Sequence, residues 1–209
     1  MAIHPVGIKN TFASHFVFWT LFLPLLTIIF VPLVVPDQNI DQQEVAMVGG
    51  FNVDLAPMTE SANKTFSALF IESGAMGASE EVFASKFEGE GFLPHNGFAA
   101  KWIRGVWLMI YKAIWRFYAL LHIFFLPVLF LTVPAAVDGF MIRARKKYRF
   151  ESYNPVFFYS STHALTLVLG LFVFLPLAPI TLSGNILAGM LVGLAISVWV
   201  ATSNFQTGA

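Results

Sequence analysis

The chain has 209 residues, of which 57% are hydrophobic and only 11% are charged. A typical soluble domain carries about 25% charged residues, so this composition excludes an ordinary soluble domain and indicates a chain that lies largely in a membrane. The formal net charge is zero, but ten of the twelve acidic residues lie between Asp37 and Glu90. The absence of cysteine excludes disulfides, thiolate nucleophiles and cysteine-ligated metals.

The first apolar run, Phe12–Val35, is long enough to cross a bilayer, which takes about 20 residues. It is longer than the apolar part of a signal peptide, and no small-residue cleavage pattern follows it. We therefore interpret it as an uncleaved signal anchor whose amino end lies in the cytoplasm. Pro24 and Pro32 are expected to kink this helix.

The next segment, 36–97, is polar and acidic and is expected on the extracytoplasmic side. Thr59 and Ser79 stand where the N-caps of two short helices are expected. Two short helices cannot bury a self-sufficient core. We expect this segment to pack on the membrane helices or on a partner.

The segment Phe98–Phe117 is amphipathic, with a basic face opposite a Trp-rich apolar face. The basic face contains Lys101, Arg104, Lys112 and Arg116. Two interpretations are open. The segment is either a helix in the membrane interface, where its bases bind lipid or a partner, or an outward extension of the second span with its bases reaching the head groups.

The remaining apolar runs predict a second, third and fourth span at Tyr118–Val137, Val156–Leu177 and Ile186–Ser203. The loop between the second and third spans, Asp138–Pro155, contains five bases: Arg143, Arg145, Lys146, Lys147 and Arg149. Short basic loops are retained in the cytoplasm, which places both termini there as well. We expect these bases to bind anionic lipid or an acidic partner rather than nucleic acid.

These segments predict an all-α membrane protein with four transmembrane helices, an amphipathic helix before the second span and a small acidic extracytoplasmic segment. We divide the chain into three regions. Residues 1–35 form the cytoplasmic N-terminus and the first span, and residues 36–97 form the acidic extracytoplasmic segment. Residues 98–209 contain the amphipathic helix, three spans and the basic loop.

The fourth span carries a pattern typical of helix packing in membranes. Small or polar residues recur at every fourth position, and we expect Gly189, Gly193 and Ser197 to contact the third span near Gly170. The bulky residues of the opposite face are expected to contact lipid; they are Leu187, Leu191, Leu194 and Val198.

Chemical motifs are sparse. His122 and His163 are functional candidates because ionisable groups inside membranes are costly, but they are expected in opposite leaflets, too far apart for one zinc ion. His15 and His163 are expected at similar depth, yet two ligands are weak support for a metal site. No nucleophile, phosphate-binding or metalloprotease motif occurs. We expect no enzyme activity, no catalytic residue, no cofactor and no metal.

The basic loop and its flanks carry a family resemblance, seen in Asp138-Gly139, Arg143–Arg149, Glu151-Ser152, Tyr159 and His163-Ala164. In these features the chain resembles small inner-membrane proteins of bacterial integrative conjugative elements and conjugative plasmids. The resemblance covers roughly Phe98–Phe205. It implies a location in the bacterial inner membrane and an accessory role in conjugative DNA transfer, beside the coupling protein or the type IV secretion channel.

Three functions remain open at this point. The first is a non-enzymatic accessory or assembly subunit of a membrane complex, with lipids and other membrane subunits as partners. The second is a small stand-alone channel, exclusion or immunity protein. The third is an auxiliary subunit of a respiratory or photosynthetic complex.

Overall fold

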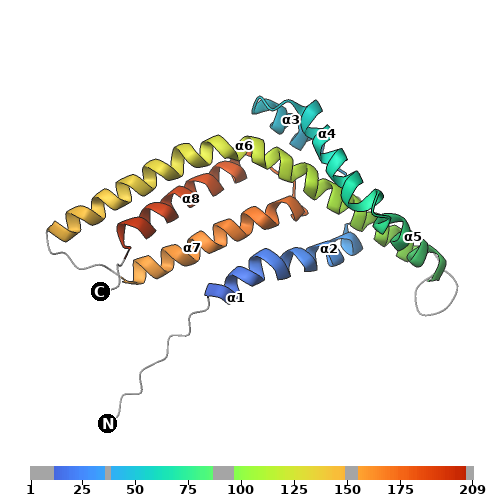
Figure 1. Cartoon of the computed structure of the whole chain (residues 1–209), viewed down its shortest axis with the longest axis horizontal. Coiled ribbons are helices and arrows are strands. Elements are labelled where there is room, and N and C mark those ends of the chain that lie inside the picture. Colours follow the sequence, from blue (N-terminus) through green and yellow to red (C-terminus); the bar gives the residue numbers. More distant parts are fainter. Residues whose placement is uncertain (1–11, 36–38, 87–96, 149–154, 206–209) are drawn as a thin grey trace, which may run out of the picture.

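The computed structural model describes residues 12–35, 39–86, 97–148 and 155–205, and every regular element in these ranges is a helix (Figure 1). Four helices are long and apolar enough to cross a membrane: Ala13–Val34, Phe98–Lys146, Val156–Leu177 and Gly184–Ser203. This confirms the prediction of an all-α, multi-pass membrane protein with four spans.

The first span is one helix with a widened turn. It consists of α1 (Phe12–Val17), a π-helical turn η1 (Phe18–Phe22) and α2 (Leu23–Val34). The π-turn lies just before Pro24, where a regular helix would lose a donor and the proline ring would clash with the preceding turn. Trp19 in this turn packs over Gly170 of the third span, where an added Cβ would lie 3.0 Å from the indole Cγ.

The longest element is α6 (Phe98–Tyr148), a single helix of 51 residues. At 1.5 Å per residue it is about 75 Å long, whereas the hydrocarbon core of a bilayer is about 30 Å thick. Residues 98–117 therefore extend the second span, which decides between the two interpretations of this segment. The first part of the predicted basic loop, Asp138–Tyr148, is helical and continues α6 without a break.

Three short helices form a cap over the N-terminal half of α6 (Figure 1): α3 (Gln42–Gly50), α4 (Leu55–Phe66) extended by a π-turn η2 (Ser67–Ile71), and α5 (Ala75–Lys86). The N-cap of α4 is Asp54, whose carboxylate accepts from the Ala56 N–H at 3.2 Å. The predicted caps Thr59 and Ser79 instead lie inside α4 and α5.

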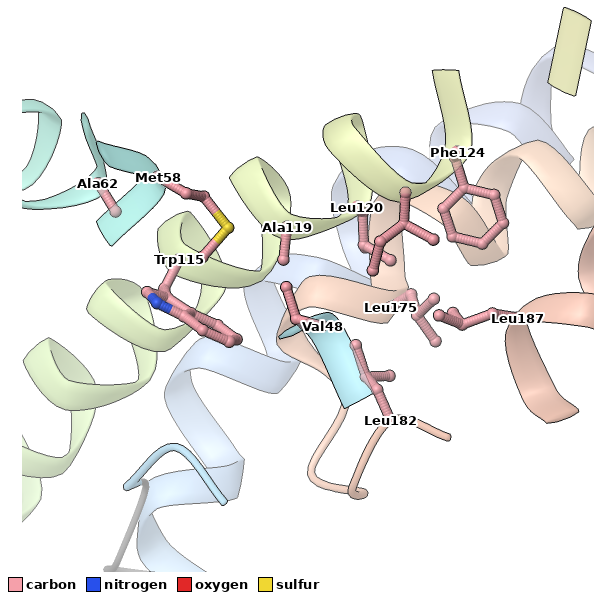
Figure 2. Packing of buried hydrophobic residues seen from close by; sticks show 11 residues of the cluster. Val48, Met58, Ala62, Trp115, Ala119, Leu120, Phe124, Leu175, Leu182 and Leu187 are labelled. Carbon is pink, nitrogen blue, oxygen red and sulfur yellow. The ribbon is translucent and has the colours of Figure 1, made fainter. Parts of the chain in front are cut away.

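The cap and the spans share a hydrophobic core at their junction (Figure 2). Its buried side chains come from α3, α4, α6, the turn η3 (Leu175–Leu177) that ends the third span, the connection after it, and the start of α8 (Gly184–Ser203). They include Val48, Met58, Ala62, Trp115, Ala119, Leu120, Phe124, Leu175, Leu182 and Leu187. The acidic segment thus packs on the membrane helices of its own chain, one of the two arrangements expected for it.

The fourth span packs differently from the prediction. α8 lies between α6 and α7 (Pro155–Phe174) in Figure 1 and contacts both. Gly189 is exposed with no atom within 4 Å of an added Cβ, while Leu187 and Leu194 are buried at 1% and 6% exposure. The expected close approach at Gly189 is therefore wrong, and so is the lipid contact expected for Leu187 and Leu194, because α8 packs these leucines against its two neighbours and leaves the Gly189 side open. Ser197 is buried, and a Cβ on Gly193 would lie 3.9 Å from Val168 of α7.

Among the described residues, the glycine that comes closest to α8 is Gly139 of α6, not a glycine of α7. A Cβ added to Gly139 would lie 2.8 Å from the carbonyl oxygen of Trp199 and would also collide with Thr202. Nearby, the Trp199 indole N–H donates to the Asp138 carboxylate at 2.7 Å. Gly139 lets α6 and α8 approach closely here, and this polar contact joins the two helices at the end opposite the cap.

Candidate functional site

A buried ion pair lies where the cap meets the spans. Arg116 of α6 and Glu44 of α3 both have side chains that are 1% exposed. The guanidinium donates to both carboxylate oxygens, through Nε at 3.0 Å and through Nη2. This bidentate geometry joins two elements that are 72 residues apart in the sequence.

The remaining donors of Arg116 hold the connection between the third and fourth spans. Nη1 donates to the carbonyl oxygens of Ala178 and Pro176 at 2.5 and 3.4 Å, and Nη2 donates to that of Ile180 at 2.7 Å. With the two bonds to Glu44, these contacts account for all five N–H donors of the guanidinium. A fully satisfied arginine of this kind joins three parts of the fold and is unavailable to an outside ligand.

The carboxylate of Glu44 also accepts from the backbone N–H of Leu182 at 2.7 Å. Close by, Asp41 caps α3: it accepts from the Gln43 N–H at 2.8 Å and from the Thr181 hydroxyl at 3.1 Å. The hydrogen bond from Gln43 lowers the pKa of Asp41 below its ordinary value, and the bond from Thr181 lowers it further. The acidic segment therefore uses at least two of its carboxylates to fix the connection between the third and fourth spans.

This arrangement corrects the assignment of Arg116 to an exposed basic face. Of the four predicted bases, Lys101 and Arg104 are exposed. Lys112 is half-buried, and its ammonium donates to the carbonyl oxygen of Asn39 at 3.1 Å. The predicted helical positions hold, but α3 covers one end of the face, which removes Arg116 from solvent.

A ladder of polar side chains fixes α4 and α5 along α6. Each rung pairs an aromatic N–H or O–H of α6 with a polar side chain of the cap. The rungs are Trp115 Nε1 to Thr59 Oγ1 at 3.1 Å, Tyr111 O–H to Asn63 Oδ1 at 2.7 Å, Trp107 Nε1 to Ser79 Oγ at 3.0 Å, and the hydroxyl pair Tyr118 and Thr65 at 2.7 Å. The Trp-rich face of residues 98–117 is therefore an intramolecular packing surface.

The opposite end of α6 carries the second group of predicted bases. Arg143 lies over the ring of Phe205, with 5.1 Å from its Cζ to the ring centroid, and Lys146 donates to Asn204 Oδ1 at 3.1 Å. Arg145 is exposed. The side chain of Lys147 and the whole of Arg149 lie outside the described part of the chain. Both Arg143 and Lys146 thus also contact the residues that follow α8.

The two intramembrane histidines lie apart. His122 is exposed and its Nδ1 lies 2.8 Å from the carbonyl oxygen of Tyr118, a contact within its own helix. His163 lies beside His15, with ring centroids 5.3 Å apart, and its Nδ1 is buried without a hydrogen-bond partner among the described residues. Within those same residues no group of three or more His, Asp or Glu side chains could hold a metal ion.

These features define a four-span helical membrane protein whose polar side chains hold a helical cap against its spans. Residues 37–206 match the family described as IncC plasmid conjugative DNA transfer protein DtrJ-like, and the chain belongs to this family. No curated protein and no solved structure matches the chain. Family membership confirms the resemblance to proteins of conjugative elements, supports a role in conjugation, and extends the match into the acidic segment.

Proposed function

We propose that the chain is a non-enzymatic accessory or assembly subunit of the conjugation apparatus in the bacterial inner membrane. Membership of a conjugative DNA transfer family supports a role of the chain in conjugation. The observation that carries the subunit role is the construction of α6, one continuous helix with the cap on its first half and basic residues near its far end, of which Arg145 is exposed.

Such a helix connects two surfaces. Arg104 near one end and Arg145 near the other are both exposed and lie about 60 Å apart along the helix. The buried ion pair and the polar ladder together hold the cap against the first half of α6. A partner bound to the cap and a partner or anionic lipid bound at the basic end would therefore keep a fixed distance across the membrane.

The first span offers a further surface for other membrane subunits. Most of its large apolar side chains are exposed, among them Phe16, Leu21, Leu25 and Phe30. In a bilayer these residues meet either lipid or the helices of partners. We expect the chain to contact proteins and lipids directly and to make no contact with DNA. Both of its termini would lie in the cytoplasm, on the same side of the membrane as the basic end of α6.

The test is deletion of the gene from its conjugative element, with transconjugants per donor as the measurement. Transfer should fall by orders of magnitude and return when the wild-type chain is supplied in trans, while replication of the element stays unchanged. Unimpaired transfer after deletion would contradict the proposal. Ion conduction by the purified chain alone would instead support a stand-alone channel.

A further inference from the structure

An apolar groove runs along the spans between α6 and the end of α7. It has a volume of about 520 Å³, and its walls include Phe117, Leu121, Phe125, Leu129, Val173 and Pro176. Four of these residues recur at every fourth position of α6 and form one wall. Phe125 is 66% exposed, which shows that the groove opens toward the surroundings of the spans.

The groove continues toward the cap. A second hollow of about 360 Å³ shares Phe117, Val173 and Pro176 with it and extends beneath η2, where Leu69 and Phe70 line it. This hollow is also lined by Thr65 and Tyr118, whose hydroxyls lie 2.7 Å apart. The combined groove is therefore apolar along the membrane helices and carries two hydroxyls at its cap end.

We propose that this groove binds a single membrane phospholipid, with one acyl chain between α6 and α7 and its ester region at the hydroxyls of Thr65 and Tyr118. The length fits. The wall from Phe117 to Leu129 covers about 18 Å along the helix, close to the half-thickness of about 15 Å that one leaflet provides.

A transmembrane helix of a partner fits the groove less well. A helix is about 10 Å wide, so a segment as long as the groove occupies roughly 1,400 Å³, more than twice the volume of the groove. Helices that associate in membranes also approach through small residues such as Gly, Ala and Ser. The groove is lined by large aliphatic and aromatic side chains together with a proline, which leave a narrow channel suited to a flexible chain.

The hydroxyls give the site selectivity over the surrounding bilayer. Burying an acyl chain gains no hydrophobic free energy in a membrane, because the lipid tails around the protein are equally apolar. The hydroxyls of Thr65 and Tyr118 form a hydrogen bond to each other, in which one of them donates, so the other O–H can donate to an ester oxygen of the lipid. One net hydrogen bond of this kind corresponds to about a fivefold increase in occupancy. A lipid bound there would contact η2, α6 and α7 and would help to hold the cap against the spans.

The experiment uses the full chain in nanodiscs of phosphatidylethanolamine and phosphatidylglycerol, with a fraction of phosphatidylethanolamine that carries a diazirine midway along one acyl chain. After irradiation, mass spectrometry locates the cross-linked residues. Labelling at Leu121, Phe125 and Val173 should exceed that at Phe130, which is 74% exposed on another face of α6, by about fivefold. Labelling in proportion to exposure alone would overturn the proposal.

Val173→Trp should fill the groove and abolish the excess labelling, and Leu121→Trp tests the same point from the opposite wall if the first variant does not fold. The matched control is Val133→Trp, at a similarly exposed position of α6 outside the groove. In cells, a photoreactive benzoyl-phenylalanine at Phe125 should form lipid adducts. A cross-link to a second copy or to another polypeptide at this position would also overturn the proposal.

Discussion

Replacement of Arg116 by Ala should destabilise the protein strongly. The change leaves the Glu44 carboxylate buried with one remaining donor, the Leu182 N–H, and removes the donor to three carbonyl oxygens of the connection between the third and fourth spans. Breaking a buried ion pair by removing one partner costs about 3–5 kcal/mol. Since folded proteins are stable by only about 5–15 kcal/mol, this is a large part of the free energy of unfolding.

The assay is equilibrium unfolding of the purified chain in mixed detergent micelles, followed by circular dichroism. Arg104→Ala is the control, because Arg104 lies exposed on the same helix and should cost less than about 0.5 kcal/mol. The double variant Arg116→Met, Glu44→Leu should recover part of the loss, since no charge then remains buried, although the carbonyl oxygens stay unpaired. A loss below about 1 kcal/mol for Arg116→Ala would refute the structural role assigned to the pair.

Three further predictions address other parts of the fold. Gly170→Leu should destabilise the chain by at least about 2 kcal/mol in the same assay, because Trp19 occupies the space that a side chain at position 170 would need. Gly189→Leu is the control and should change the stability by less than about 1 kcal/mol, since the space beside Gly189 is open. Equal effects of the two changes would contradict the described packing. Because the pKa of Asp41 is lowered in the folded chain, its carboxylate stabilises the fold above about pH 4, and this contribution is lost as the pH falls further. Amide hydrogen exchange in α3 should therefore accelerate in acid. The variant Asp41→Asn should show no such acid-specific change. Exchange of both Arg145 and Lys146 for Gln removes two bases worth about 1 kcal/mol each, so binding to anionic vesicles, measured by co-flotation, should weaken by about thirtyfold. Unchanged binding would exclude a charge-based lipid contact.

Much of the fold could be predicted from the sequence because spanning helices have a strong composition signal. The four apolar runs correspond to four helices of sufficient length. The ends of the first, third and fourth lie within a few residues of the prediction, but the second extends well beyond Tyr118–Val137 at both ends, as Phe98–Lys146. The extent of α6 could not be decided, since an amphipathic segment before a span has the same pattern whether it bends into the interface or continues straight. The contacts between α6 and the cap, which are not visible in the local pattern, join residues 28 to 72 positions apart.

The candidate site was harder to predict for the same reason. The pattern places Arg116 correctly on a basic helical face, but nothing near it in the sequence indicates that Glu44 covers it. Only the concentration of acidic residues in 36–97 hints at partners for the bases of 98–117. Likewise the spacing of Gly189 and Gly193 predicts a small-residue face, but which face of α8 is buried depends on α8 having neighbours on two sides.

The most direct measurement of the proposed role is affinity isolation of the tagged full chain from membranes of conjugating donor cells after mild cross-linking, with quantitative mass spectrometry. We predict that inner-membrane subunits of the transfer apparatus are recovered with the chain at a constant ratio. Recovery of the chain only as a homo-oligomer, or only with respiratory subunits, would contradict it.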